Sequence, residues 1–178
     1  MGLQAVHRFL IAVLGVAASS TIASITCDTV KAATTIPFTV STSLEYIKHQ
    51  TEYWSTSCGD LKPACIIEPT TTAEVAAIVR ILLSNNETFA VKSGGHNPNN
   101  YFASIDNGPL ISTSKLNEVV LDKTKNTVKV GPGNRWDEVA LALDGTGISV
   151  VGGRIGNVGV GGYMLGGLTL KPFPKLIS

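Results

Sequence analysis

A histidine on a glycine turn is the most chemically suggestive feature of the sequence. The stretch Phe89–Tyr101, FAVKSGGHNPNNY, carries a strand-like run into Gly94 and Gly95, and His96 follows directly. Because the two glycines place no side chain in the way, the imidazole can lie against a flat, bulky ligand. The ring is also nucleophilic enough to bond covalently to an electrophilic methylene group of a cofactor. A turn histidine that simply bonds nearby backbone is the alternative.

A second segment, residues 152–168, holds eight glycines in seventeen residues, too many for a regular helix or strand. Bare backbone N–H groups in such a segment can converge on an anion. The two standard nucleotide motifs are absent. Gly131-Pro-Gly133 lacks the third glycine of G-x-G-x-x-G, Gly159-Val-Gly161 runs into Met164 where that glycine is required, and no Gly-Lys-Ser/Thr occurs. The pattern predicts a glycine-rich ligand cradle, with loops that only pack on each other as the alternative.

Other chemistries are disfavoured. A secreted α/β-hydrolase would show G-x-S-x-G, which is absent, and Ser93 near His96 has no positioned third member of a triad. No C-x-x-C pair exists and no histidine stands at ligand spacing from a cysteine, so no metal site is predicted. His49 lies in a polar patch and is expected to be solvated.

The elements that must position these groups begin at Cys65. Residues 64–69, ACIIEP, read as a short strand, and residues 71–86 as a helix with Thr71 and Glu74 at capping-box spacing. The helix carries one apolar face at the i, i+3, i+4 spacing, made by Val75, Ile78, Val79, Leu82 and Leu83. Residues 88–93, TFAVKS, form the next strand. Strand, helix and strand predict a βαβ unit with parallel strands.

Further elements follow the glycine turn. Residues 109–113, 117–122 and 126–131 are strand candidates, and alternation within the last two predicts half-buried antiparallel strands. Residues 135–147 predict a short helix that ends at glycines, and ISVVGG, residues 148–153, predicts a last strand. Residues 25–60 are expected to be a lead-in segment that packs its aromatic side chains on the domain.

Bulk composition bounds the class of protein. The chain has 178 residues, 44% of them hydrophobic, and a net charge of +1, which fits one globular domain. The charge gives no reason to expect a nucleic-acid or membrane-surface partner. Residues 1–24 combine Arg8, an apolar run from Phe9 to Ala18 and small residues, the pattern of a secretory signal peptide. That run is too short for the roughly 20 residues of a membrane span, and a buried core helix is the alternative.

Export would place the chain where disulfides persist. The cysteines are Cys27, Cys58 and Cys65, an odd number, so one is left over. We favour the pair Cys27–Cys65, with Cys58 as a competitor for either partner. Asn86 opens the glycosylation sequon Asn-Glu-Thr between the predicted helix and strand.

Three motifs together carry a family resemblance. FAVKSGGHNPNN, VGPGNRWDEVALAL and VVGGRIGNVGVGGYMLGG, in this order between Pro63 and Gly167, resemble the FAD-linked oxidases with a PCMH-type (vanillyl-alcohol-oxidase-like) FAD-binding domain. The resemblance is strongest to secreted fungal relatives of berberine bridge enzyme. It implies an α+β fold over residues 61–178: an N-terminal βαββ subdomain and the beginning of a second, glycine-rich subdomain, with FAD between them.

The resemblance also implies the site residues. The Lys92–Asn97 loop would wrap the FAD pyrophosphate through backbone amides, with His96 attached to the flavin 8α-methyl group, and glycines of the second segment would line the other side. The implied set is Lys92, Ser93, Gly94, Gly95, His96, Asn97, Gly152, Gly153, Gly159, Val160, Gly161 and Gly162.

The sequence departs from the family pattern at three places. Ile155 stands where many relatives have a cysteine that makes a second flavin link, so one covalent link at most is expected. Lys92 stands where arginine is frequent, which keeps the charge but loses the bidentate fork. After Gly167 the chain reads LTLKPFPKLIS, where relatives continue into the rest of the FAD domain and a substrate domain. The chain is therefore expected to be C-terminally truncated, and no catalytic base can be named.

The resemblance implies an FAD-dependent oxidoreductase. Its partners would be FAD, a small-molecule substrate such as an alcohol, which gives a hydride to the flavin, and O2 as the electron acceptor. The protein would supply orientation and electrostatics, while the cofactor supplies the chemistry. The alternatives are a non-catalytic truncated remnant and a secreted binding module that uses the glycine loops for another anion.

Overall fold

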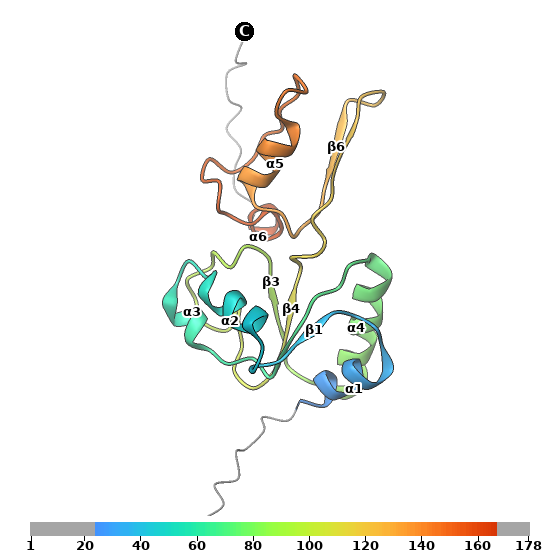
Figure 1. Cartoon of the computed structure of the whole chain (residues 1–178), viewed down its shortest axis with the longest axis vertical. Coiled ribbons are helices and arrows are strands. Elements are labelled where there is room, and N and C mark those ends of the chain that lie inside the picture. Colours follow the sequence, from blue (N-terminus) through green and yellow to red (C-terminus); the bar gives the residue numbers. More distant parts are fainter. Residues whose placement is uncertain (1–23, 167–178) are drawn as a thin grey trace, which may run out of the picture.

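The computed structural model describes residues 24–166, which form two parts stacked end to end (Figure 1). The expected signal peptide, residues 1–24, lies outside the described residues except for Ser24, and so does the expected truncated end after Gly166. None of the described helices is long and apolar enough to span a bilayer.

The first part is built on a four-stranded sheet in the order β1-β2-β4-β3. Strands β2 (Cys65–Ile67), β4 (Pro109–Ser112) and β3 (Ala90–Lys92) are parallel, and β1 (Phe38–Thr39) pairs antiparallel with β2. All residues of β2 and β4 are buried, as expected for strands covered on both faces. The predicted parallel βαβ unit is therefore confirmed, but β4 lies between its two strands.

Helices cover both faces of this sheet. Helices α1 (Ile25–Ala33) and α4 (Thr72–Asn85) lie on one face, and α2 (Leu44–Thr51) and α3 (Thr56–Asp60) lie on the other (Figure 1). Because successive strand residues point to opposite faces, Ile67 joins the core under α4 and Ile66 joins the core under α2.

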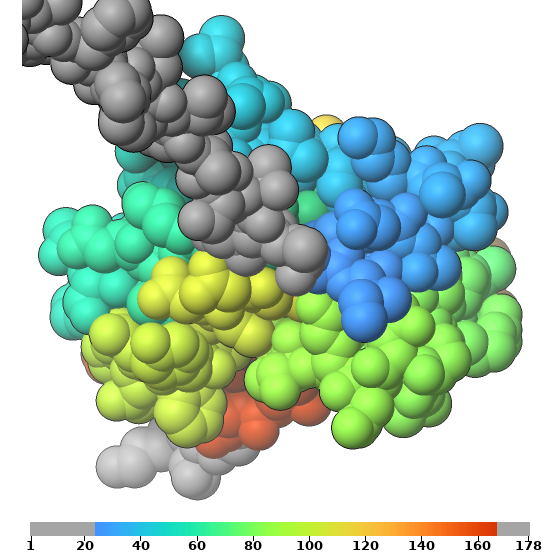
Figure 2. All heavy atoms as spheres, turned by 90° about the horizontal axis from the view of Figure 1, so that it is seen from below, coloured from blue at the N-terminus to red at the C-terminus, as the bar shows by residue number. Residues whose placement is uncertain are grey.

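The segment expected to be a lead-in is an integral part of this fold. Figure 2 shows the N-terminal segment lying against the segment that contains α4. The Thr26 amide donates to Glu87 Oε2 over 2.8 Å. The predicted disulfide Cys27–Cys65 is present and joins α1 to β2, which leaves Cys58 unpaired and buried within the described chain.

Helix α4 begins as predicted but buries a narrower face. Thr71 Oγ1 accepts a hydrogen bond from the Glu74 amide. The Glu74 carboxylate in turn accepts from the amide of Thr70, and not from the amide of the cap residue Thr71. Ile78 and Leu82 are buried, whereas the side chains expected beside them, Val79 and Leu83, are exposed.

The second part packs a hairpin against two helices. Strands β5 (Val119–Asp122) and β6 (Thr127–Val130) pair antiparallel, which confirms the prediction from their alternation. Helices α5 (Trp136–Leu143) and α6 (Val160–Leu165) complete the small core, whose buried members are Trp136, Val139, Leu143 and Val160.

The predicted strand at residues 148–153 is wrong, because the structure has no regular element there. The β-branched residues of ISVVGG favour a strand locally. In the fold, however, Gly152 and Gly153 lie against the ring of Trp136, where a Cβ atom would come within 2.3 and 2.5 Å of ring carbons. Packing on the tryptophan therefore decides the path of this segment.

Candidate functional site

The two glycine segments meet where β3 ends. A Cβ atom on Gly94 would lie 2.4 Å from the Gly159 amide nitrogen, and a Cβ on Gly159 would lie 2.2 Å from that of Gly94. Side chains do not approach backbone this closely, so any other residue at either position would force the segments apart. The junction between the two parts of the molecule therefore depends on these two glycines.

Ser93 links three segments at this junction. Its hydroxyl donates to the Pro132 carbonyl over 2.7 Å and accepts from the Gly161 amide over 3.2 Å. The Thr113 hydroxyl, just after β4, also donates to the Pro132 carbonyl. The end of the parallel sheet is thereby tied to the 131–133 turn and to the start of α6.

The turn that carries the histidine presents free amides. Gly95 has φ +68°, in the left-handed region that favours glycine. Among the described residues, no acceptor takes a hydrogen bond from the amides of Gly94, Gly95, His96 or Asn97, although Gly94 and Gly95 are buried. Because buried amides in folded proteins are almost always paired, this run of N–H groups fits an anionic ligand.

His96 is half-buried and held by two residues. Its Nε2 lies 3.2 Å from Asn157 Oδ1, and its ring lies 5.7 Å from that of Trp54, tilted by 31°. The Trp54 amide donates to the Gly95 carbonyl over 3.1 Å. With the Asn157 oxygen as acceptor, Nε2 carries the proton and Nδ1 keeps its lone pair. Nδ1 has no hydrogen-bond partner within the described part of the chain.

Arg135 binds the backbone of Asn157. Its Nη1 donates to the Asn157 carbonyl over 2.7 Å, and its Nη2 lies 3.4 Å from the Glu52 carbonyl, just past α2. Sequence reasoning missed Trp54, Arg135 and Asn157. No local pattern relates these residues to His96, since the contact between His96 and Asn157 spans 61 positions.

The Lys92 side chain packs against the turn, where a Cβ atom on Gly95 would lie 3.0 Å from Lys92 Cε. It is 2% exposed; its Nζ donates to the His49 carbonyl over 2.6 Å and lies 4.2 Å from the centre of the Tyr53 ring. Burial lowers the pKa of Lys92 to about 8, an effect that the Glu52 carboxylate partly offsets. The backbone of Lys92 belongs to the β3–β4 ladder, where its carbonyl accepts from the Thr113 amide, and its ammonium group fixes the turn to α2.

The remaining predicted residues divide into two groups. Gly152 and Gly153 make room for Trp136, so packing alone accounts for their lack of a side chain. Gly161 and Gly162 lie in the first turn of α6 beside the buried Val160, and a Cβ on Gly162 would meet nothing within 4 Å. The side chain of Ile155, at the place of the second-link cysteine, is exposed.

His49 is not solvated, contrary to the expectation from its polar neighbours. It is 4% exposed, because it shares the inner face of α2 with the buried Tyr46. Its Nε2 lies 3.2 Å from Glu68 Oε1.

The surface also has two open hollows of about 590 Å³, one between α1 and α4 and one between α2 and α3. Neither of these two hollows is lined by the glycine turn.

Comparison with protein families matches residues 63–169 to the FAD binding domain. An uncharacterized FAD-linked oxidoreductase of Arthroderma benhamiae is 44% identical over 126 residues, which cover 70% of this chain and 25% of that protein. The FAD-dependent monooxygenase macF of Penicillium terrestre is 43% identical over 116 residues, covering 65% of this chain and 22% of that protein. The chain thus spans about a quarter of the length of the curated relatives it matches.

Solved structures show the same fold. Aclacinomycin oxidoreductase matches with a TM-score of 0.64 and 25% identity over 74% of this chain and 27% of that chain. Physcomitrella patens BBE-like 1 matches with a TM-score of 0.62 and 22% identity over 72% of this chain and 28% of that chain.

Proposed function

We propose a function for this chain from the family to which it belongs: it is a member of the FAD-binding domain family and has the PCMH-type fold of FAD-linked oxidoreductases related to berberine bridge enzyme. It would hold FAD at the junction of its two parts. The amides of Gly94 to Asn97 would bind the pyrophosphate, and His96 would carry a covalent link to the flavin. The chemistry that FAD supplies when bound is the acceptance of a hydride equivalent from an organic substrate.

The observation that carries this proposal is the run of four amides, Gly94 to Asn97, that donate to no acceptor within residues 24–166, two of them on buried glycines. An unpaired amide costs about 1–3 kcal/mol when it is fully shielded from water, so a ligand that accepts from these groups is favoured. A pyrophosphate supplies several acceptor oxygens and negative charge at once. Arg135, whose guanidinium lies beside Asn157, adds positive charge on the same side of the junction.

Covalent attachment is supported by the setting of His96. Asn157 holds Nε2, so the lone pair on Nδ1 is left for bond formation, and Trp54 restricts the tilt of the ring. No cysteine stands at position 155 to make a second link. We therefore expect one covalent bond to the flavin, through Nδ1 of His96.

For the whole protein we propose oxidation of an alcohol or a related small molecule, with O2 as the electron acceptor. Several relatives carry the name FAD-dependent monooxygenase, which also fits a reaction with oxygen. Secretion and glycosylation at Asn86 remain part of the proposal. The Cys27–Cys65 disulfide fits an oxidising compartment, and Asn86 is exposed at the end of α4.

The test is a denaturing gel of the full chain, acid-treated and viewed under ultraviolet light, for the wild type, His96→Ala and Lys129→Ala. We expect a fluorescent band for the wild type and for Lys129→Ala, whose side chain is exposed on the distant hairpin. The His96→Ala variant should give a band without fluorescence. FAD that is bound without a covalent link should still be released when the folded variant is denatured. A dark wild-type band with releasable FAD would refute only the covalent link. Wild-type protein without any flavin would refute the proposal and favour a binding module for another anion.

A further inference from the structure

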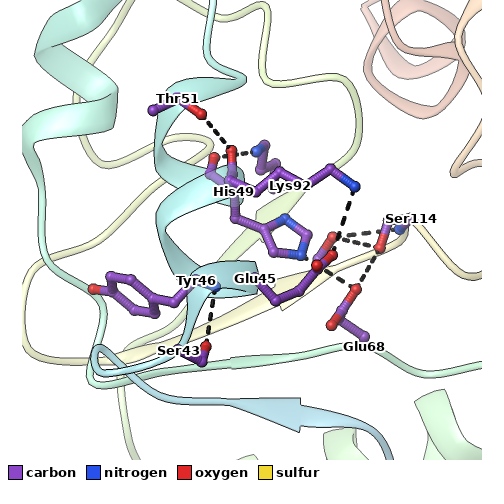
Figure 3. Close-up of polar contacts among 10 residues, drawn as sticks. Ser43, Glu45, Tyr46, His49, Thr51, Glu68, Lys92 and Ser114 are labelled. Carbon is purple, nitrogen blue, oxygen red and sulfur yellow. Dashed lines mark hydrogen bonds and ion pairs between the residues drawn. The ribbon is translucent and has the colours of Figure 1, made fainter.

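A cluster of metal-ligating side chains lies between α2 and the end of β2. Glu45 and His49 are four residues apart on the helix, so they share one face. Glu68 follows directly after β2, and Figure 3 shows the three side chains converging. One ligand atom from each lies within 4.8 Å of the other two.

Two of the three side chains are buried, and one of them, His49, lacks hydrogen bonds. His49 is 4% exposed and Glu68 is 2% exposed. Neither ring nitrogen of His49 makes a hydrogen bond within the described residues. Nε2 lies 3.2 Å from Glu68 Oε1, close enough for an ion pair but not in hydrogen-bonding geometry. A buried imidazole aimed at carboxylates without a hydrogen bond calls for a further partner.

The carboxylate of Glu68 is held in place by a neighbouring hydroxyl. The Ser114 hydroxyl donates to Glu68 Oε1 over 2.9 Å. A carboxylate whose oxygen is oriented by a neighbouring hydroxyl is typical of metal ligation, because outer hydrogen bonds fix the ligand in place.

The donor set and spacing fit a divalent transition-metal ion. One imidazole and two carboxylates are frequent zinc ligands, with bonds of about 2.0–2.2 Å. Two ligands of a tetrahedral zinc ion then lie about 3.3 Å apart, close to the separation of Nε2 and Oε1. The competing Lys48 ammonium is 3.7 Å from Glu45 Oε1 in a largely exposed pair, which contributes little.

We propose that Glu45, His49 and Glu68 bind a divalent transition-metal ion, for which Zn²⁺ fits best, with water completing the coordination. Glu45, which is only half-buried, would turn inward to close the site. The ion would fix α2 to the end of β2. Because Lys92 donates to the carbonyl of His49, the metal would also steady the support on which the glycine turn rests.

The experiment measures zinc binding by the full chain with its disulfide intact, after treatment with EDTA and dialysis. Isothermal titration with ZnCl₂ should give one site per chain with a Kd in the micromolar range or tighter. Zn²⁺ should also raise the melting temperature, whereas MgCl₂ at the same concentration should not. His49→Gln and Glu45→Gln should each weaken zinc binding at least about tenfold.

Glu45→Gln is the decisive variant, since it leaves the buried His49–Glu68 pair intact and should fold even if His49→Gln does not. Glu118→Gln is the matched control: it removes a carboxylate from an exposed ion pair on the hairpin and should bind zinc like the wild type. Zinc affinity that Glu45→Gln leaves unchanged would overturn the proposal, since the ion would then lie elsewhere, for instance at His96. A wild-type chain that binds no zinc would overturn it as well, and His49 and Glu68 would be a simple buried ion pair.

Discussion

The two parts of the molecule that meet at the glycine junction differ in how they are held together. The first part has strands buried on both faces, helices on either side and a disulfide that joins α1 to β2. The core of the second part has four buried apolar residues among those that the structure describes, and its hairpin strands are half-buried or exposed. Large apolar side chains remain exposed there, among them Leu141, Ile155 and Leu165.

The two parts also contribute different residues to the candidate site. The first part supplies His96, Ser93 and the amides of the glycine turn from the end of a parallel sheet whose two inner strands are buried. The second part supplies Asn157, Arg135 and the opposing glycine from loops that follow a weakly buried core. The geometry around His96 therefore depends on the contacts that join the second part to the first.

The largest expected effect tests the contrast in core packing. Ile67→Ala in β2 should lower the free energy of unfolding by about 2–5 kcal/mol, because its side chain is fully buried between β2 and α4. Val128→Ala in β6 should lower it by only about 1 kcal/mol, because that side chain is half-buried. Urea unfolding of both variants measures the difference, and equal losses would contradict the proposed contrast.

An intermediate effect is expected at the junction itself. Gly94→Ala should lower the free energy of unfolding by about 1–3 kcal/mol, because the new Cβ meets the backbone of Gly159. Gly162→Ala serves as the matched control, since its Cβ meets nothing within 4 Å and alanine favours the helix by up to about 1 kcal/mol. Urea unfolding of the flavin-free chain gives both values. If Gly94→Ala is as stable as the wild type, the two glycine segments are not in contact in solution.

The smallest effect on stability should fall on Asn157. Asn157→Ala removes the group that holds His96 Nε2 but leaves the backbone contact with Arg135. The free energy of unfolding should change by less than about 0.5 kcal/mol, since the site is exposed. Covalent flavin attachment should nevertheless slow, and it can be followed as band fluorescence over time after FAD is added. An unchanged rate would show that Asn157 does not orient the histidine.

Elements of both parts could be predicted from local patterns. The helix at 72–85 follows from its apolar spacing and from Thr71 as a cap, and the β5–β6 hairpin follows from period-two alternation. The wrong prediction at 148–153 and the burial of His49 have a common cause. Local composition favoured a strand in one case and a solvated helix face in the other, and contacts with distant residues, Trp136 and Glu68, decided otherwise.

By itself the sequence determined most of the local elements and the chemical character of the turn, because side-chain periodicity, capping residues and glycine content act over only a few positions. It favoured the Cys27–Cys65 pair but left Cys58 as a competitor, and the fold decided between them. Only the tertiary structure decided that Gly94 meets Gly159, that Asn157 holds His96, and that Glu45, His49 and Glu68 converge. Those contacts join elements whose relative placement depends on how the sheet, its helices and the second part pack. No spacing along the chain encodes that packing.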